Sequence, residues 1–131
     1  MLIDWPIEFD RWLDQVEEAG GPAAELAISL LAELEVLDGP PQRETLVLKR
    51  LRKVRRHELW RLAHAHHPEF AIRIIVWFAV DERAAIALVG FDKARLGDVW
   101  YPSAAIRAEA QVDQWLRERK AYGDESDRPP G

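Results

Sequence analysis

One arginine stands inside the most apolar segment of the chain. Arg73 is the only charged residue between Phe70 and Val80, a run rich in β-branched and aromatic residues. Such a run predicts a central strand that is buried on both faces. A guanidinium stays protonated, so Arg73 must reach water, a carboxylate or a phosphate. It is therefore a candidate for phosphate chemistry, and the alternative is a structural arginine whose head group reaches solvent or a salt bridge.

Basic residues are concentrated in the middle of the chain. The net charge is −5, and residues 1–42 contain ten acidic residues but one base, whereas residues 43–73 contain nine Lys and Arg, three Glu and all four His. A positive band on an acidic protein predicts an anion-binding face, and nucleic acid is the commonest such partner. The alternatives are docking on an acidic protein and a charged segment that simply faces water. The candidate RNA contacts here are Lys49, Arg50, Arg52, Lys53, Arg55, Arg56, Arg61, His64 and His66.

Length and composition predict a single small domain. The chain has 131 residues, 48% of them hydrophobic and 31% charged, and no cysteine. We expect the domain to span residues 1–122, followed by a polar, flexible tail at 123–131. The absence of cysteine excludes disulfides and thiolate metal sites. Neither a signal peptide nor a membrane-spanning segment is recognisable, so we expect a cytoplasmic protein that does not contact membranes.

The hydrophobic periodicity predicts an α+β fold. A short edge strand over residues 1–5 precedes two helices, one over 7–18 and one from Pro22 to about 38. Strands follow at 58–63, 70–80 and 84–91, and a last helix begins at Pro102. The order β-α-α-β-β-β-α predicts helices packed on a small antiparallel sheet. The basic run 49–56 fits either a helix or an extended arm.

This succession of motifs resembles the RelE/ParE/HigB superfamily, and most closely the HigB-like, phage-derived toxins of bacterial toxin–antitoxin pairs. The matching features are the paired helices, the Leu-Trp-Arg-Leu strand, Ile-Arg-Ile at 72–74, Leu-Val-Gly-Phe-Asp-Lys at 88–93 and the last helix. The resemblance implies the RelE-like fold over roughly residues 1–120. It also implies a ribosome-dependent, metal-independent mRNA endonuclease that inhibits translation. Its implied partners are mRNA on the ribosome and a cognate antitoxin of the helix-turn-helix type.

The resemblance also assigns catalytic positions. Arg73 matches the arginine of the middle strand. Lys93 matches the lysine after the next strand, with Arg95 two residues on, and Tyr101 matches the aromatic residue near the last helix. Trp100, beside Tyr101, is a further candidate RNA contact. Where the family commonly reads Glu-Leu-Arg, this chain reads Arg61-Leu62-Ala63. Arg61, His64 and His66 are the candidates to replace that arginine.

The chemistry of these side chains fits RNA cleavage without a cofactor or metal. Attack of the 2′-OH on phosphorus needs fixed positive charge on the phosphate and groups that move protons. Arginine and lysine supply the charge, and tyrosine can stack on a base or transfer protons. The His64-x-His66-His67 cluster has three interpretations: a plain loop, a general base or a metal site.

Two other functions share the same expected fold. A ParE-like inhibitor of gyrase performs no RNA chemistry, and an inactive prophage-derived module only binds its antitoxin. The grouping of Lys93, Arg95 and Tyr101 favours RNA cleavage over gyrase inhibition.

Overall fold

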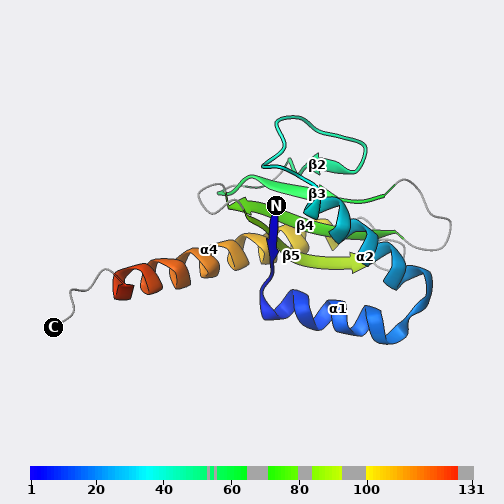
Figure 1. Cartoon of the computed structure of the whole chain (residues 1–131), viewed down its shortest axis with the longest axis horizontal. Helices are drawn as coiled ribbons and strands as arrows, with labels where there is room; N and C mark the ends of the chain where they lie inside the picture. Colours follow the sequence, from blue (N-terminus) through cyan, green and yellow to red (C-terminus); the bar gives the residue numbers. More distant parts are fainter. Residues whose placement is uncertain (53, 55, 65–70, 80–83, 93–99, 127–131) are drawn as a thin grey trace.

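The computed structural model describes residues 1–52, 54, 56–64, 71–79, 84–92 and 100–126, with the side chains of 100, 101 and 121–126 left aside. These residues form three helices and five strands in an α+β arrangement (Figure 1). The helices are α1 (Ile7–Ala19), α2 (Gly21–Glu35) and α4 (Trp100–Ser126). The strands are β1 (Leu2–Asp4), β2 (Leu48–Arg50), β3 (Leu59–Leu62), β4 (Ile72–Ala79) and β5 (Ala84–Asp92).

The five strands form one mixed sheet in the order β1-β5-β4-β3-β2. The neighbours β2–β3, β3–β4 and β4–β5 are antiparallel, but β1 runs parallel to β5. The prediction of a purely antiparallel sheet was therefore wrong in this detail. A parallel neighbour needs a long crossover connection, and here the chain passes through α1, α2 and three further strands between β1 and β5.

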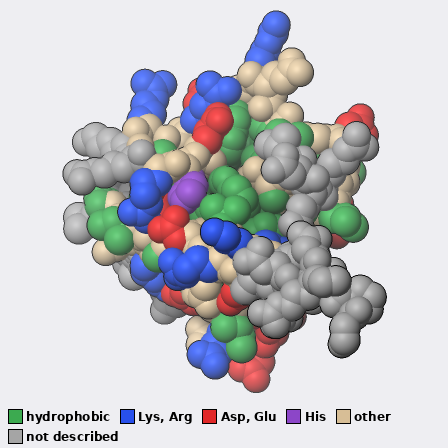
Figure 2. All heavy atoms as spheres, turned by 90° about the vertical axis from the view of Figure 1, so that its left-hand side faces the viewer, with side chains coloured by type: hydrophobic (Ala, Val, Ile, Leu, Met, Phe, Trp, Pro, Cys, Tyr) green, Lys and Arg blue, Asp and Glu red, His purple; other side chains and the backbone are tan. Residues whose placement is uncertain are grey.

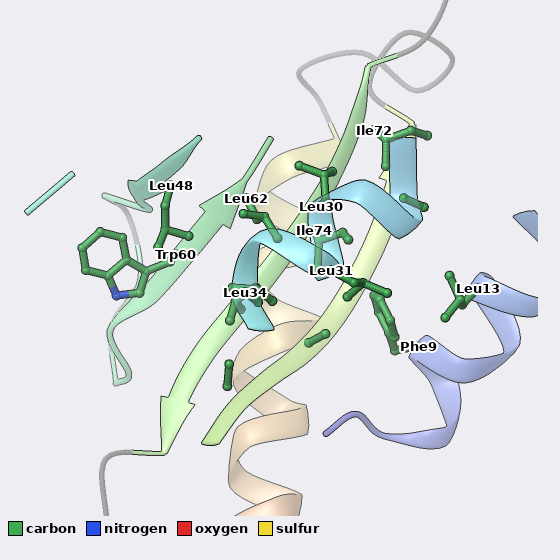
Figure 3. Packing of buried hydrophobic residues seen from close by; sticks show 14 of the residues in the cluster. Phe9, Leu13, Leu30, Leu31, Leu34, Leu48, Trp60, Leu62, Ile72 and Ile74 are labelled. Atoms are coloured by element: carbon green, nitrogen blue, oxygen red, sulfur yellow. The ribbon is translucent and has the colours of Figure 1, made fainter. Parts of the chain in front are cut away.

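Each face of the sheet is covered by its own helical layer. We call the face covered by the helical pair α1 and α2 the hairpin face. Phe9, Leu13, Leu30, Leu31 and Leu34 of these helices pack there on alternate strand residues, as Figure 3 shows. The α4 face carries Ala104, Ala108 and Val112 of the last helix, packed on the other set of strand residues. The central strand β4 is thus buried from both sides, as its apolar sequence predicted.

Two glycines allow α1 and α2 to follow each other with almost no loop. Gly20 and Gly21 have φ angles of 67° and 72°, a region that side chains with a Cβ rarely adopt. The amide of Gly20 donates to the carbonyls of Val16 and Glu17, which closes the end of α1. This sharp link brings both helices onto the same face of the sheet.

The largest differences from the predicted element bounds lie at two places. The basic run 49–56 begins in a strand and not in a helix or a free arm, because Lys49 and Arg50 belong to β2 and pair with β3. The last helix begins at Trp100, before Pro102, and continues to Ser126, past the predicted end of the domain at residue 122. Residues 127–131 of the predicted tail lie outside the described residues. No helix among the described residues has the length and apolar character needed to cross a membrane.

Candidate anion-binding site

The strand register gathers three basic residues on the α4 face of the sheet. Lys49 of β2 lies directly opposite Arg61 of β3, and Arg61 lies opposite Ile75 of β4. Arg73 precedes Ile75 by two residues and therefore points to the same face. Arg61 and Arg73 are diagonal neighbours, which places their positions about 7–8 Å apart in a regular sheet. We call Lys49, Arg61 and Arg73 the cation row.

The two arginines of the cation row have unsatisfied donors. Both side chains are partly exposed, yet the Nε atom of each is buried and has no hydrogen-bond partner among the described residues. Arg73 donates from Nη1 to the backbone carbonyl of Ile72, at 3.1 Å. Among the described residues, no carboxylate forms an ion pair with Lys49, Arg61 or Arg73. Positive charge and directed N–H donors therefore converge on one region of the sheet.

Such an arrangement is unfavourable for the folded protein alone. Like charges directly opposite each other on neighbouring strands destabilise a sheet. A buried donor left without a partner costs about 1–3 kcal/mol. A bound phosphate offsets the repulsion between the like charges, because arginine guanidinium groups match its oxygens in bidentate geometry. The cation row is accordingly a candidate anion-binding site.

Strand alternation directs two other predicted RNA contacts to the opposite face. Arg50 neighbours Lys49 but faces the hairpin side, where its guanidinium lies 5.0 Å from the centre of the Trp60 ring and pairs with Glu58 at 2.9 Å. His64 follows β3, and its Nε2 lies 3.0 Å from the Ser29 hydroxyl of α2. Neither side chain can therefore share a ligand with Arg61 and Arg73.

Arg56 and His57, just before β3, contact two carboxylates of α4. Arg56 pairs through Nη2 with Asp113 at 2.6 Å, and its Nε lies 3.6 Å from Glu109. His57 contacts the same Asp113 through Nε2 at 2.7 Å. The hydrogen bond from His57 lowers the pKa of Asp113, helped by the charges of Arg56 and Arg117 and opposed by burial. Arg56, a predicted RNA contact, is thus already held by carboxylates.

His57 and Asp113 were not among the residues that the sequence pointed to. They are 56 residues apart, and no local pattern links a loop histidine to a carboxylate in the middle of a helix. The only available signal was the position of Asp113 on the polar face of a predicted helix. Such a signal does not specify a partner.

For the other predicted catalytic residues, the side chain or the whole residue lies outside the described part of the chain. Helix α4 begins at Trp100, so Tyr101 is its second residue, and the side chains of both are left aside. Trp115 of α4 contacts Trp77 near the end of β4, and Ala104, eleven residues earlier in the helix, is buried on the same face of the sheet. The first turns of α4 therefore extend toward the end of the sheet that carries Arg73. Outside the described residues lie Lys53, Arg55, His66, Lys93 and Arg95. Arg52 is described and exposed.

Neither a metal-binding cluster among the described residues nor a similar protein points to a function for this site. Within the described residues, no group of three or more His, Asp or Glu side chains could hold a metal ion, and His66 and His67 lie outside them. Comparison of the chain with protein-family models, with curated proteins and with solved structures gives no match.

Proposed function

We propose that this protein is a ribosome-dependent mRNA endonuclease, the toxin of a toxin–antitoxin pair with a RelE-like fold of the HigB type. The observation that carries the proposal is the cation row, with its two unpartnered Nε donors on one sheet face. The order of elements supports it, because two amino-terminal helices, a sheet and a carboxy-terminal helix are what the sequence resemblance implies.

The proposed reaction needs no metal. The 2′-oxygen of a ribose forms a bond to the neighbouring phosphorus while the bond from phosphorus to the 5′-oxygen breaks. A base accepts the 2′-hydroxyl proton and an acid donates a proton to the leaving 5′-oxygen, which leaves a 2′,3′-cyclic phosphate and a 5′-hydroxyl. Arg73 and Arg61 stabilise the charge that develops on the phosphate oxygens. On this proposal Lys93 and Arg95 add positive charge, and Tyr101 stacks on a base or transfers a proton.

Controlled expression in a bacterial host tests the proposal. We expect wild-type protein to arrest growth and to produce cleaved, ribosome-associated mRNAs with 5′-hydroxyl ends. Arg73→Ala should lower cleavage by about a hundredfold, since removal of one group that stabilises transition-state charge has effects of this size. Arg61→Ala should act in the same direction.

Arg50→Ala is the matched control, because it removes an arginine charge from β2, next to Lys49 but on the opposite face of the sheet. If Arg50→Ala impairs cleavage as much as Arg73→Ala, general positive charge and not the cation row is responsible. Accumulating DNA breaks with intact mRNA indicate a gyrase inhibitor instead. Normal growth with abundant folded protein indicates an inactive antitoxin-binding module.

A further inference from the structure

Strand β2 lies at one end of the described sheet, where its three residues pair with β3 alone. Figure 1 shows it at the top of the molecule, next to the loop that leads from α2. Leu48 anchors β2 on the hairpin face, where its side chain is buried among the residues labelled in Figure 3. Lys49 belongs to the cation row and lies opposite Arg61. Repulsion between these two like charges acts to separate β2 from β3.

The backbone of β2 has an inner edge that bonds to β3 and an outer edge that faces away from the sheet. On the inner edge, the carbonyl of Val47 accepts a hydrogen bond from the amide of Ala63 at 2.8 Å. Because backbone groups alternate in direction along a strand, Lys49 also bonds toward β3. The amides and carbonyls of Leu48 and Arg50 then point outward, and an edge strand usually presents such groups unpaired.

Two residues just before the strand bond to these outward groups. The amide of Thr45 donates to the carbonyl of Leu48 at 2.9 Å, and the amide of Leu48 donates to Oγ1 of Thr45 at 3.0 Å. Oε1 of Glu44 accepts from the amide of Arg50, also at 3.0 Å. We call Glu44 and Thr45 the edge strap. It engages three of the four outward backbone groups of Leu48 and Arg50, and so fastens both ends of β2 from the outer side.

We propose that Glu44 and Thr45 are positioning residues, which hold β2 against β3 and so keep Lys49 opposite Arg61 in the cation row. Both residues of the edge strap are exposed, so hydrogen bonding and not burial ties them to the strand. Their bonds offset the repulsion between Lys49 and Arg61, which a pairing of only three residues otherwise has to resist. This inference rests on the proposed function, because RNA binding at the cation row is what needs Lys49 in place.

Hydrogen exchange of the free protein tests the edge strap without RNA. The amides of Leu51 and Ala63 bond between β3 and the two ends of β2, so their exchange reports whether the strands stay paired. Glu44→Ala and Thr45→Val each remove an acceptor and should speed this exchange about tenfold, without a change at the amides of β4. Glu44→Gln and Thr45→Ser keep an acceptor and should exchange more slowly than the Ala and Val variants. Leu46→Ala is the matched control, because Leu46 adjoins Thr45, is 92% exposed and contributes no bond to the strap.

Fluorescence anisotropy with a fluorescein-labelled single-stranded RNA tests the position of Lys49 in the full chain. Acidic and basic side chains lie close together on the face that Figure 2 shows, and the net charge is −5, so loss of a carboxylate by itself favours RNA binding. Glu44→Ala should nevertheless bind about threefold more weakly than Glu44→Gln, the size of one exposed charge interaction. Both variants lack the charge, and only glutamine keeps the acceptor. In a Lys49→Ala background the two should bind equally.

Three results overturn the proposal. The first is exchange at Leu51 and Ala63 that is equal in wild type, Glu44→Ala and Thr45→Val. The second is equal RNA binding by Glu44→Ala and Glu44→Gln when Lys49→Ala weakens it. The third is a difference between these two variants that persists in the Lys49→Ala background, because the strap then acts on the fold as a whole. Faster exchange in the strap variants, with RNA binding unchanged in Lys49→Ala, instead supports the strap and rejects the cation row as the RNA site.

Discussion

At the scale of single residues, the protein keeps positive charge where the fold alone does not favour it. Arg61 and Arg73 hold buried, unpartnered Nε atoms, and Lys49 lies directly across from Arg61. Other arginines of the same basic band do have partners, Arg50 with Glu58 and Arg56 with Asp113. This contrast supports the anion-binding role that we propose for the cation row.

Replacing Arg61 by leucine should therefore stabilise the protein. The change removes one like charge and one unsatisfied donor and adds apolar contact area, so we expect the free energy of unfolding to rise by about 1 kcal/mol. Urea titration of wild type and variant measures the difference. Arg50→Leu is the control and should be destabilising, because it breaks the Glu58 pair and the contact with Trp60. A loss of stability in Arg61→Leu would contradict this account.

The carboxylate of Asp113 should make stability dependent on acid pH. Its pKa lies below the ordinary value of 3.8 in the folded protein, so the fold favours the ionised form. That stabilisation is complete above the ordinary value and disappears as the pH falls through the lower, folded value. Asp113→Asn should therefore lower the free energy of unfolding at pH 7, and the difference from wild type should shrink below about pH 4. Urea unfolding across this range, with Asp14→Asn on an exposed part of α1 as control, tests the expectation.

At the scale of the elements, close contact between α1 and β5 depends on one glycine. Trp12 of α1 lies against Gly90 of β5, and a methyl group at residue 90 would overlap the six-membered ring of this indole. The neighbouring groove of about 730 Å³ runs between the same two elements. Gly90 therefore allows α1 to approach the sheet closely, and this contact fixes how α1 packs on the hairpin face.

Gly90→Ala should destabilise the protein by about 1–3 kcal/mol, the usual range for overpacking a filled site. The smaller side chain of Trp12→Leu removes the overlap, so the double variant should be more stable than the two single effects added together. Thermal and urea unfolding of the four proteins give the coupling energy. Simple additivity would mean that the strand and the helix do not meet at this point.

At the scale of the whole molecule, periodicity predicted most of the elements and little of the site. The central strand, both amino-terminal helices and the last helix follow from apolar patterns that depend on neighbours in sequence. The three-residue β2 was missed, since Lys49 and Arg50 read as part of a charged run. Arg73 was recognisable because it interrupts an apolar strand. Lys49 could not be placed beside Arg61 without the pairing register, and register depends on long-range contacts.

The salt dependence of RNA binding tests the whole surface at once. If three phosphates contact the cation row, the logarithm of the association constant for single-stranded RNA should fall with the logarithm of salt concentration at a slope of about −2. Lys49→Ala and Arg61→Ala should each reduce the slope by about 0.7. Arg50→Ala should leave it unchanged, since that guanidinium faces the other side. A slope near zero for wild type would exclude phosphate binding at this surface.

The parallel pairing of β1 with β5 has a consequence for how the protein is made. Leu2 pairs with Ala84, so the first strand emerges from the ribosome long before its neighbour has been translated. Until β4 and β5 follow, the apolar sides of α1 and α2 have no sheet to cover them. During synthesis the nascent chain therefore exposes the apolar surface of α1 and α2, and chaperones bind such segments.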